Sequence, residues 1–414
     1  MSFFRINIYL SIKNFFLSFF LLEKKKIKKI TTFLSNKSKK KNIYLTSQLR
    51  VGFIIVLRYL KKKHPEKKEI VISSYNLAEM INICKNLNLK VIHPKLNENL
   101  FICENDLKSR VNKKTLAVVA TNMFNTYENS IKIKNTCNKK KIPLIEDNAI
   151  YFGNFKKIKN KKIYAGSFGD YSLNSFNVMK NISAMFGGSI ETNDSNFSDF
   201  VGREIKSYKK FPPIKFLVQS SIFIILKILS VKIIYKLFFF NLIKRANFKK
   251  NIFILSIVYP SLRFKKKPFP NYYFTKMNYL SRNMIYLQIN EFKNFNINHA
   301  AKKNNNIYYQ KIFKNKKIKN IKVLKNTDFN FQNYNDFPIL VKKKKDLVNY
   351  LFSKGIETKT IQYVDCHKIF KTRRNHKILT EYENKIICLP NHKNITHKYI
   401  DYIVRCIDMF YKNL

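Results

Sequence analysis

Between residues 43 and 147 the chain alternates short apolar segments with amphipathic ones, and this alternation restricts the fold more than any other feature. The apolar segments have the length and the Val, Ile and Leu content of buried strands, and the stretches between them fit helices. We expect strands at Glu69–Ser73, Lys90–His93, Thr115–Ala120 and Pro143–Glu146, and helices at Val51–Leu60, Ala78–Asn86 and Ser130–Lys139. Strands and helices in this order form a mostly parallel sheet with helices on both faces. The predicted fold class is therefore α/β.

Two acidic residues stand where such a sheet binds ligands. Glu146 and Asp147 lie at the end of the predicted strand 143–146. Ligands of open α/β sheets bind beyond the carboxyl ends of the strands. Both carboxylates are therefore candidates for a site at this edge.

The predicted organisation has four parts. Residues 1–44 form a basic, apolar N-terminal arm, and residues 45–204 form the large domain. Residues 205–270 interrupt the alternating pattern as an insertion, and residues 271–414 form a linking helix followed by a small domain.

The N-terminal arm is apolar but too interrupted to cross a membrane. Arg5 and Lys13 divide it, and its longest apolar run, Phe15–Leu22, is much shorter than the ~20 residues that a bilayer requires. No small-residue cleavage site follows, which argues against a signal peptide. We expect an amphipathic arm at a membrane or subunit surface.

The insertion allows two interpretations. Phe216–Leu242 is strongly apolar, but Lys227, Lys232 and Lys236 divide it into runs that are again too short to span a bilayer. It forms either a buried helical insertion or helices that lie in the membrane interface, where Lys side chains extend towards water. We favour the second interpretation, and thus a peripheral membrane contact through residues 205–270.

The last part of the chain predicts a small α+β domain. A long helix begins near Asn278, and Gly355 stands at a natural helix-ending position. The further elements expected are a strand at Asp336–Val341, a helix at Lys344–Lys354, a strand at Ile356–Gln362 and a terminal helix at His397–Tyr411.

The formal net charge of +55 is large but does not identify a partner. Lys residues occur in every segment, together with many Asn, Ile, Phe and Tyr and few Ala and Gly, which is the bias that A/T-rich codons produce. Nucleic-acid binders concentrate charge on one face or in a recognisable motif. We find no such motif and expect no nucleic-acid partner, whereas an anionic membrane or a phosphate-bearing substrate would also use this field.

Cysteine and histidine spacing argues against disulfides and metals. The six cysteines are far apart and form no CxxC pair, which is typical of reduced thiols in a cytoplasmic protein. The seven histidines show no HxxxH or HExxH spacing, so no metal site is expected.

The motifs that indicate chemistry surround one lysine. Residues 166–194 read GSFGDYSLNSFNVMKNISAMFGGSIETND, in which Lys180 stands five residues after Ser175 and shortly before Gly187-Gly188. Upstream, residues 143–149 read PLIEDNA and contain Asp147. A single lysine means little in so Lys-rich a chain, but this ordered spacing defines a frame around Lys180.

In these motifs the chain resembles the DegT–StrS family of sugar aminotransferases, which have the fold type I architecture of pyridoxal-phosphate (PLP) enzymes. The family pattern SFxxxKN(I/L)xxxxGGxxxTND is matched in spacing throughout, and PLIEDNA is similar to the family's (V/I)IEDxA. FSKGIET, at residues 352–358, and CLPNH, at residues 388–392, resemble two elements of the family's small domain. The resemblance covers about residues 45–200 and 278–414.

The resemblance implies roles for three residues. Lys180 would form a Schiff base with the cofactor aldehyde and, once displaced by an amino donor, would move protons. Asp147 would pair with the pyridine nitrogen and keep it protonated. Ser175 would hydrogen-bond the cofactor phosphate. The alternatives that do not involve a cofactor are a helix cap for Asp147, a turn or cap for Ser175 and a solvated side chain for Lys180.

Other positions depart from the family pattern. Ile150 stands where the family commonly has a Gln that contacts the ring hydroxyl of the cofactor, and Leu49 stands where it often has a phosphate-binding Gly. The guanidinium group of Arg50 can still pair with a phosphate through two N–H donors. The alternative is that Arg50 is only a surface charge. Tyr75 follows the strand 69–73 and is a candidate to stack on the cofactor ring. Asn278 lies near the family's asparagine that reaches the neighbouring subunit.

Taken together, the resemblance implies amino transfer from an amino acid to a nucleotide-linked keto-sugar, in the synthesis of surface polysaccharide or a related glycan. It also implies a homodimer, because family active sites are completed across the interface. The expected location is cytoplasmic, with peripheral contact at the inner face of the cell membrane. The alternative is a catalytically altered or inactive member that acts as a membrane-associated scaffold. A family dehydratase carries a histidine in place of the lysine, so the retention of Lys180 favours transamination.

Overall fold

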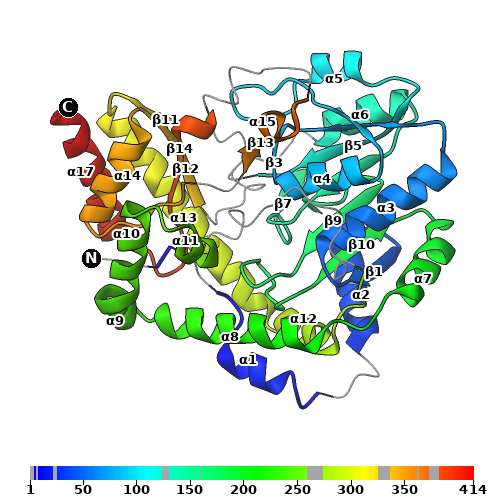
Figure 1. Ribbon diagram of the computed structural model, residues 1–414, viewed down its shortest axis with the longest axis horizontal. Coiled ribbons are helices and arrows are strands. Elements are labelled where there is room, and N and C mark those ends of the chain that lie inside the picture. The colour runs from blue at the N-terminus through cyan, green and yellow to red at the C-terminus, as the bar shows by residue number, and fades with distance from the viewer. Residues whose placement is uncertain are drawn as a thin grey trace.

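A computed structural model of the chain describes residues 4–5, 8–21, 26–123, 130–158, 160–258, 274–324, 336–360, 363–372 and 382–414. Its centre is a seven-stranded sheet of order β1-β10-β9-β6-β5-β2-β4 (Figure 1). The neighbours from β4 to β9 run parallel, whereas β10 and β1 are antiparallel to the strands beside them. The predicted mostly parallel α/β sheet is therefore confirmed. Its strands are β1 (Asn42–Thr46), β2 (Glu69–Ile72), β4 (Lys90–Ile92), β5 (Thr115–Thr121), β6 (Leu144–Asp147), β9 (Tyr171–Ser175) and β10 (Gly188–Thr192).

Helices cover both faces of this sheet because both faces are apolar. In β2, Ile70 and Ile72 pack with helices α3 (Leu49–Lys63) and α4 (Ala78–Asn86). Val71, which points the other way, packs with α5 (Glu104–Arg110) and α6 (Ser130–Lys139). Side chains alternate between the faces of a strand, so a continuous apolar run such as Ile70-Val71-Ile72 requires a cover on each side.

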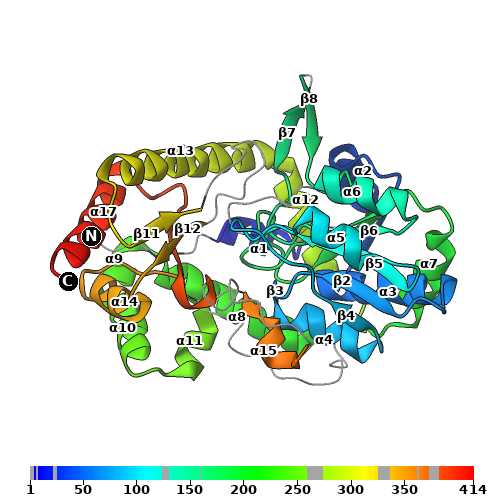
Figure 2. The same cartoon turned by 90° about the horizontal axis from the view of Figure 1, so that it is seen from above.

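The carboxyl-terminal part of the chain forms a smaller unit around an antiparallel sheet of order β11-β12-β14. The long helix α13 links it to the central sheet (Figure 2). The elements of this part are α12 (Tyr279–Asn290), α13 (Phe292–Lys316), β11 (Ile321–Val323), β12 (Asp336–Val341), α14 (Lys344–Ser353), β13 (Val364–Asp365), α15 (Cys366–Phe370), β14 (Ile386–Pro390) and α17 (His397–Lys412). β13 pairs with the short strand β3 (Tyr75–Asn76), which joins the small unit to the edge of the large one.

Two features differ from the sequence prediction. The strand expected at Ile356–Gln362 is wrong for residues 356–360, where only Lys359 forms an isolated bridge with Cys388, and residues 361–362 lie outside the described part of the chain. A hairpin of β7 (Phe155–Ile158) and β8 (Lys161–Tyr164) projects from the large domain and was not predicted (Figure 2). Its sequence is too rich in Lys to show the alternation of a half-buried strand.

The N-terminal arm and the insertion are helical and lie against each other. The arm contains α1 (Ile12–Leu17) and α2 (Lys26–Ser38). After α7 (Phe197–Ser207), which crosses the expected boundary at residue 205, the insertion continues with α8 (Pro213–Leu229), α9 (Lys232–Ile234), the π-helix η1 (Tyr235–Phe239), α10 (Phe240–Phe248) and α11 (Ile252–Val258). Among the described residues, no helix has both the length and the apolarity needed to cross a membrane.

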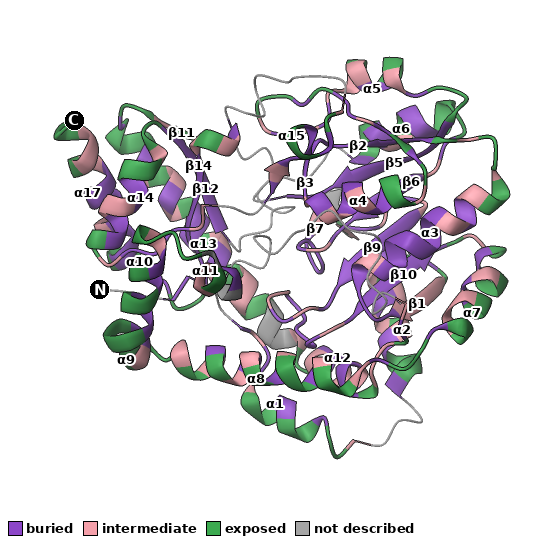
Figure 3. Cartoon of the chain, viewed as in Figure 1, coloured by how far each residue is buried: buried purple, intermediate pink, exposed green. Residues whose placement is uncertain are grey.

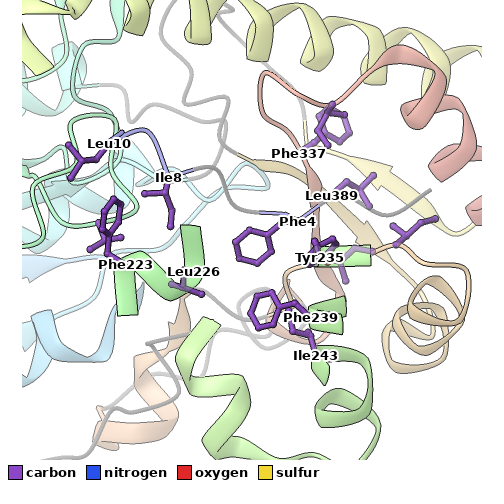
Figure 4. Close-up of a cluster of buried hydrophobic side chains, with 14 of the residues drawn as sticks. Phe4, Ile8, Leu10, Phe223, Leu226, Tyr235, Phe239, Ile243, Phe337 and Leu389 are labelled. Atoms are coloured by element: carbon purple, nitrogen blue, oxygen red, sulfur yellow. The ribbon is translucent and has the colours of Figure 1, made fainter. Parts of the chain in front are cut away.

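One apolar cluster unites these added helices with the small unit. The ring of Phe4 lies 5.4 Å from that of Tyr235 and 5.5 Å from that of Phe239, and the same cluster contains Phe337 of β12 and Leu389 of β14 (Figure 4). The inner sides of the arm and of the insertion are thus part of the core of the molecule.

Candidate functional site

Several polar residues meet at the carboxyl-terminal edge of the central sheet. Asp147 is the last residue of β6 and pairs with Leu173 of β9, which ends two residues later at Ser175. Ser73 and Ser74 follow the end of β2. Because these strands are parallel, their ends share one edge, as the sequence predicts for Asp147.

Lys180 lies in the loop that leaves this edge after β9. Its backbone N–H donates to the carbonyl of Asn177 over 3.0 Å, which closes a tight turn. The loop is held on both sides: Ala184 donates to the carbonyl of Phe176 over 2.7 Å, and the amide Nδ2 of Asn181 donates to the carbonyl of Phe152 over 2.9 Å. The backbone around Lys180 is therefore anchored, whereas its amine makes no hydrogen bond with the residues that the structure describes.

The surroundings of Lys180 favour an uncharged amine. Enclosure by protein lowers the pKa of Lys180 to about 8. The carboxylate of Asp147 acts in the opposite direction, and the positive charges of Lys359 and Arg50 lower the pKa further. Since an amine must be neutral to attack a carbonyl carbon, this environment prepares Lys180 to act as a nucleophile or a base near neutral pH.

Asp147 is buried and has few partners. Its Oδ1 accepts a hydrogen bond of 3.0 Å from the backbone N–H of Ala149. Burial raises the pKa of Asp147, while that hydrogen bond and the charge of Lys180 lower it. A buried carboxylate whose second oxygen accepts no hydrogen bond from the described residues is well suited to pair with a cationic nitrogen of a ligand.

Gly188 brings the N-terminus of α3 to the same edge. Its backbone pairs with Ser175 on one side and with Thr46 on the other. A Cβ atom on Gly188 would lie only 2.6 Å from the backbone nitrogen of Leu49 and 2.7 Å from the carbonyl carbon of Gln48. The absence of a side chain thus lets the first turn of α3, with its partial positive charge, lie beside Ser175.

Three buried polar atoms near this helix end and the end of β2 lack a partner in the described structure. They are Oγ of Ser47, Oε1 of Gln48 and Oγ of Ser74. Buried polar atoms without partners are rare in folded proteins and call for an explanation such as a bound group.

Two of the predicted site residues have protein partners of their own. Arg50 Nη1 lies 3.3 Å from Oε1 of Glu79, so its charge is shared with a carboxylate. Tyr75 is fully buried in β3, where its ring centroid lies 5.9 Å from that of Tyr363. Burial raises the pKa of Tyr75 well above its usual range, so its hydroxyl stays protonated.

The positions that depart from the family pattern have structural roles. Leu49 packs into the core under α3, and Ile150 packs with Tyr151 and Ala165. The side chain of Asn278 accepts a hydrogen bond of 2.8 Å from the backbone N–H of Leu280 and caps α12.

Lys359 was not predicted from the sequence as a residue of this site. Its Nζ lies 3.0 Å from Oδ2 of Asp336, and its charge acts on Lys180. It directly follows the FSKGIET motif, but a lysine carries little information in a chain with this composition. Ser74 was missed because serine at the end of a strand is common.

Comparison with known proteins finds similarity in both sequence and structure. The chain is 26% identical over 132 residues to GDP-perosamine synthase of Vibrio cholerae, a match that spans 32% of this chain and 35% of that protein. The matched part is thus about a third of that relative's length.

Solved structures share the fold over almost the whole chain. The Helicobacter pylori aminotransferase PseC, involved in the biosynthesis of pseudoaminic acid, has a TM-score of 0.74 at 15% identity, with 100% of each chain covered. The E. coli GDP-4-keto-6-deoxy-D-mannose-3-dehydratase, solved with bound hydrated PLP, has a TM-score of 0.70 at 19% identity, with 97% of this chain and 100% of that chain covered.

The sequence model of one family matches residues 21–203 and 272–408, on both sides of the insertion. These ranges contain Lys180, Asp147 and Ser175 together with the small unit, and they leave out α8 to α11 and residues 1–20 of the N-terminal arm. With well over half of its residues matched, the chain belongs to the DegT/DnrJ/EryC1/StrS aminotransferase family.

Proposed function

We propose that the chain is a PLP-dependent aminotransferase that moves an amino group from an amino-acid donor to a keto-sugar linked to a nucleotide. The observation that carries the proposal is the position of Lys180, whose amine lies within electrostatic range of the buried Asp147 at the strand-end edge. Family membership and the nucleotide-sugar chemistry named for the compared proteins support the same reaction class.

The residues at this edge fit PLP. The backbone N–H groups in the first turn of α3 and the unpartnered hydroxyls of Ser47 and Ser74 offer hydrogen-bond donors for a phosphate. Ser175 would hold the phosphate as well, Asp147 would pair with the ring nitrogen, and Lys180 would carry the covalent bond. Arg50, which already pairs with Glu79, would contribute long-range positive charge, and Tyr75 of β3 would stack on the cofactor ring.

In the reaction, PLP would act as an electron sink conjugated to the amino group of the substrate. The Nζ of Lys180 would accept the proton from the donor carbon and deliver it, on the same face, to the carbon at the other end of the transferring C–N–C unit. Its pKa of about 8 suits both directions of this transfer. Asp147 keeps its partner nitrogen protonated, which is the condition for the electron sink.

A dehydratase is the second candidate, because the E. coli structure named above is a dehydratase of a related sugar. Lys180 is retained here, and a lysine can be displaced by an amino donor and later restored. We therefore favour amino transfer. Membership of the aminotransferase family also disfavours a scaffold without catalytic activity.

The covalent role of Lys180 can be tested directly. Purified protein incubated with PLP and then reduced with borohydride should carry one label, located by mass spectrometry on the peptide that contains Lys180. Lys180→Ala should lose the label. Lys139→Ala, which removes an exposed lysine of α6, should retain it. A label on other lysines, with none on Lys180, would refute the assignment.

The amino transfer can be tested without the sugar. An amino-acid donor such as glutamate, added to the loaded protein in the absence of a sugar, should release about one equivalent of its keto acid per site. Addition of a nucleotide-linked keto-sugar should then consume the stored amino group. Loss of a sugar hydroxyl with release of the stored amino group as ammonia would instead indicate dehydration.

Two features of the expected assembly remain proposals. A homodimer is expected from the family resemblance, and sedimentation equilibrium of the full chain measures it. A cytoplasmic location with peripheral membrane contact through residues 205–270 is expected from the composition of the insertion. The exposed apolar side chains of that segment indicate which surface would make this contact.

A further inference from the structure

The segments outside the family match carry an unusual number of exposed apolar side chains. The match leaves out residues 1–20 and 204–271. In the arm, Phe16 is 54% exposed and Phe20 is 83% exposed. In the insertion, the large apolar residues that are exposed are Ile214, Leu217, Val218, Ile225, Ile228, Val231, Ile233, Leu237, Phe238, Leu242, Phe248 and Phe253.

These two segments form one layer. The rings of Phe15 in α1 and Phe223 in α8 lie 5.5 Å apart, and Nζ of Lys227 donates to the carbonyl of Ile8. Figure 1 shows α1 and α8 side by side along one edge of the molecule, with α9 at the end of α8. We call α1, residues 18–20, α8, α9 and η1 the outer layer.

Helix α8 is apolar on two opposite sides. Phe216, Ser220, Phe223 and Leu226 face the protein and are buried. Ile214, Leu217, Val218, Ile225 and Ile228 recur at helical spacing on the opposite side and are exposed, as Figure 3 shows along the outer side of α8. A helix at the surface of a soluble protein normally carries polar residues on that side. The outer side of α8 is therefore built to contact something apolar.

The segments that form this layer carry charges of one sign, and the nearby carboxylate of Glu291 accepts a hydrogen bond of 2.9 Å from Asn14 of α1. No Asp or Glu occurs between residues 205 and 290, nor before Glu23 in the arm. Lys232 and Lys236 are exposed beside the apolar side chains, and Lys249 and Lys250 follow at the end of α10. An apolar surface whose own segments carry many lysines and no carboxylate matches a partner with an apolar interior and an anionic surface.

We infer that the outer layer, built jointly by the arm and the insertion, docks the protein onto an anionic membrane surface. The apolar side chains of α1 and α8 enter the boundary between headgroups and acyl chains, and the lysines at their borders contact the headgroups. A second copy of the chain is a poorer occupant. Two such layers face to face would oppose lysines to lysines, because the segments of the layer carry no carboxylate of their own.

The inference goes beyond the proposed enzymatic function and is tested separately from it. The full chain is mixed with vesicles of phosphatidylcholine and phosphatidylglycerol, and with vesicles of phosphatidylcholine alone, and the bound fraction is measured by sedimentation. Deletion of residues 205–270 is unsuitable, because Phe223, Tyr235 and Phe239 belong to the core. Substitutions on the exposed side avoid this problem.

Two variants address the two halves of the layer. Phe16→Glu with Phe20→Glu changes the arm, and Leu217→Glu with Ile225→Glu changes α8. Each should weaken binding to the anionic vesicles at least about tenfold, because it removes buried apolar contact and adds negative charge. The control is Ile307→Glu with Met409→Glu, which changes two apolar residues of similar exposure, 43% and 48%, on α13 and α17. This control should bind like the unchanged chain.

Thermal unfolding and borohydride labelling of Lys180 on the same samples show that each variant is folded and that its cofactor chemistry is intact. Vesicle binding that both layer variants retain would overturn the inference. Equal loss in the control variant would do so as well. Absence of vesicle binding by the unchanged chain, combined with a self-associated form that the layer variants lose, would show that a second copy occupies the surface.

Discussion

At the scale of single residues, the charge state of Lys180 determines when the site can act. The neutral amine is the reactive form, and burial moves the pKa of this group from 10.5 to about 8. The rate of covalent PLP attachment should therefore rise about tenfold between pH 7 and pH 9 and then level off. Stopped-flow absorbance at a series of pH values measures this profile.

Asp147→Asn provides the matched comparison. The carboxylate of Asp147 raises the pKa of Lys180, so its removal should move the same profile towards lower pH. A profile that does not move in Asp147→Asn would show that the two groups do not interact. The variant should also bind PLP less tightly, since the ring nitrogen loses its ionic partner.

Gly188 is the second residue whose effect is local and measurable. Gly188→Ala places a methyl group within 3 Å of backbone atoms of Gln48 and Leu49, so α3 must move away from β10. We expect a loss of about 1–3 kcal/mol in the free energy of unfolding, together with weaker PLP binding. Chemical denaturation and equilibrium titration measure the two effects.

Gly202 provides the control for that substitution. It lies in α7, and a Cβ atom there would have no heavy atom within 4 Å. Gly202→Ala should stabilise the protein by about 0.5–1 kcal/mol, because alanine favours the helix. If Gly188→Ala and Gly202→Ala destabilised the protein equally, the loss of stability in Gly188→Ala would not result from close packing at that position.

At the scale of elements, the arm is held to the small unit by a buried ionic cluster. Arg5 Nη1 lies 3.3 Å from Oδ1 of Asp336, and its backbone N–H donates to Oε2 of Glu357 over 3.2 Å. Asp336 also binds Lys359, whose charge acts on Lys180. The arm is thus connected through two ion pairs to the surroundings of the reactive amine.

Arg5→Met leaves the two carboxylates with less positive charge in a buried place. We expect a loss of about 3–5 kcal/mol in the free energy of unfolding, because removing one partner of a buried ion pair leaves the charge of the other partner uncompensated. Lys322→Met, which breaks an exposed pair with Glu98, should cost no more than about 1 kcal/mol. Similar values for the two variants would contradict the burial of the cluster.

The sequence predicted those elements whose pattern is local. Helix Ala78–Asn86 and strand Asp336–Val341 have the predicted bounds, because their apolar spacing reflects burial directly. The hairpin of β7 and β8 carries no such pattern. The burial of Arg5 depends on partners more than three hundred residues away, and no window of sequence contains that information.

The same distinction applies to the site. Lys180, Asp147 and Ser175 stand in motifs with defined spacing, and the structure brings them to one edge of the sheet. Lys359 belongs to the small unit, where it forms a bridge with Cys388 of β14, and only the packing of the two units brings its charge to bear on Lys180. Their roles towards the cofactor remain proposals that the labelling experiment decides.

At the scale of the whole molecule, one histidine makes the assembly of arm and small unit sensitive to acid. Both ring nitrogens of His392 are occupied as in a neutral imidazole: Nε2 lies 2.8 Å from the carbonyl of Phe4, and Nδ1 accepts from the backbone N–H of Asn394 over 3.3 Å. Burial lowers the pKa of His392 to about 4. A second ring proton has no acceptor in this arrangement.

The unfolded chain binds this proton near pH 6.5, whereas the folded chain resists it until about pH 4. The contribution of neutral His392 to the free energy of unfolding is therefore fully present above pH 6.5. The free energy of unfolding should fall by about 3 kcal/mol as the pH decreases to 4. The free energy of unfolding, measured by denaturant titration across this range, shows the slope. His392→Gln should flatten it, and an unchanged slope in that variant would assign the acid sensitivity to other groups.

The burial of Phe4 and Arg5 also has a consequence for biosynthesis. Their partners Asp336, Glu357 and His392 are translated 331 to 388 residues later. At the ~5–20 residues per second of protein synthesis, the arm waits on the order of tens of seconds before its binding place exists. During that time its phenylalanines are uncovered on the nascent chain. A membrane or a chaperone near the ribosome would therefore have access to the arm before its binding place in the folded chain has formed.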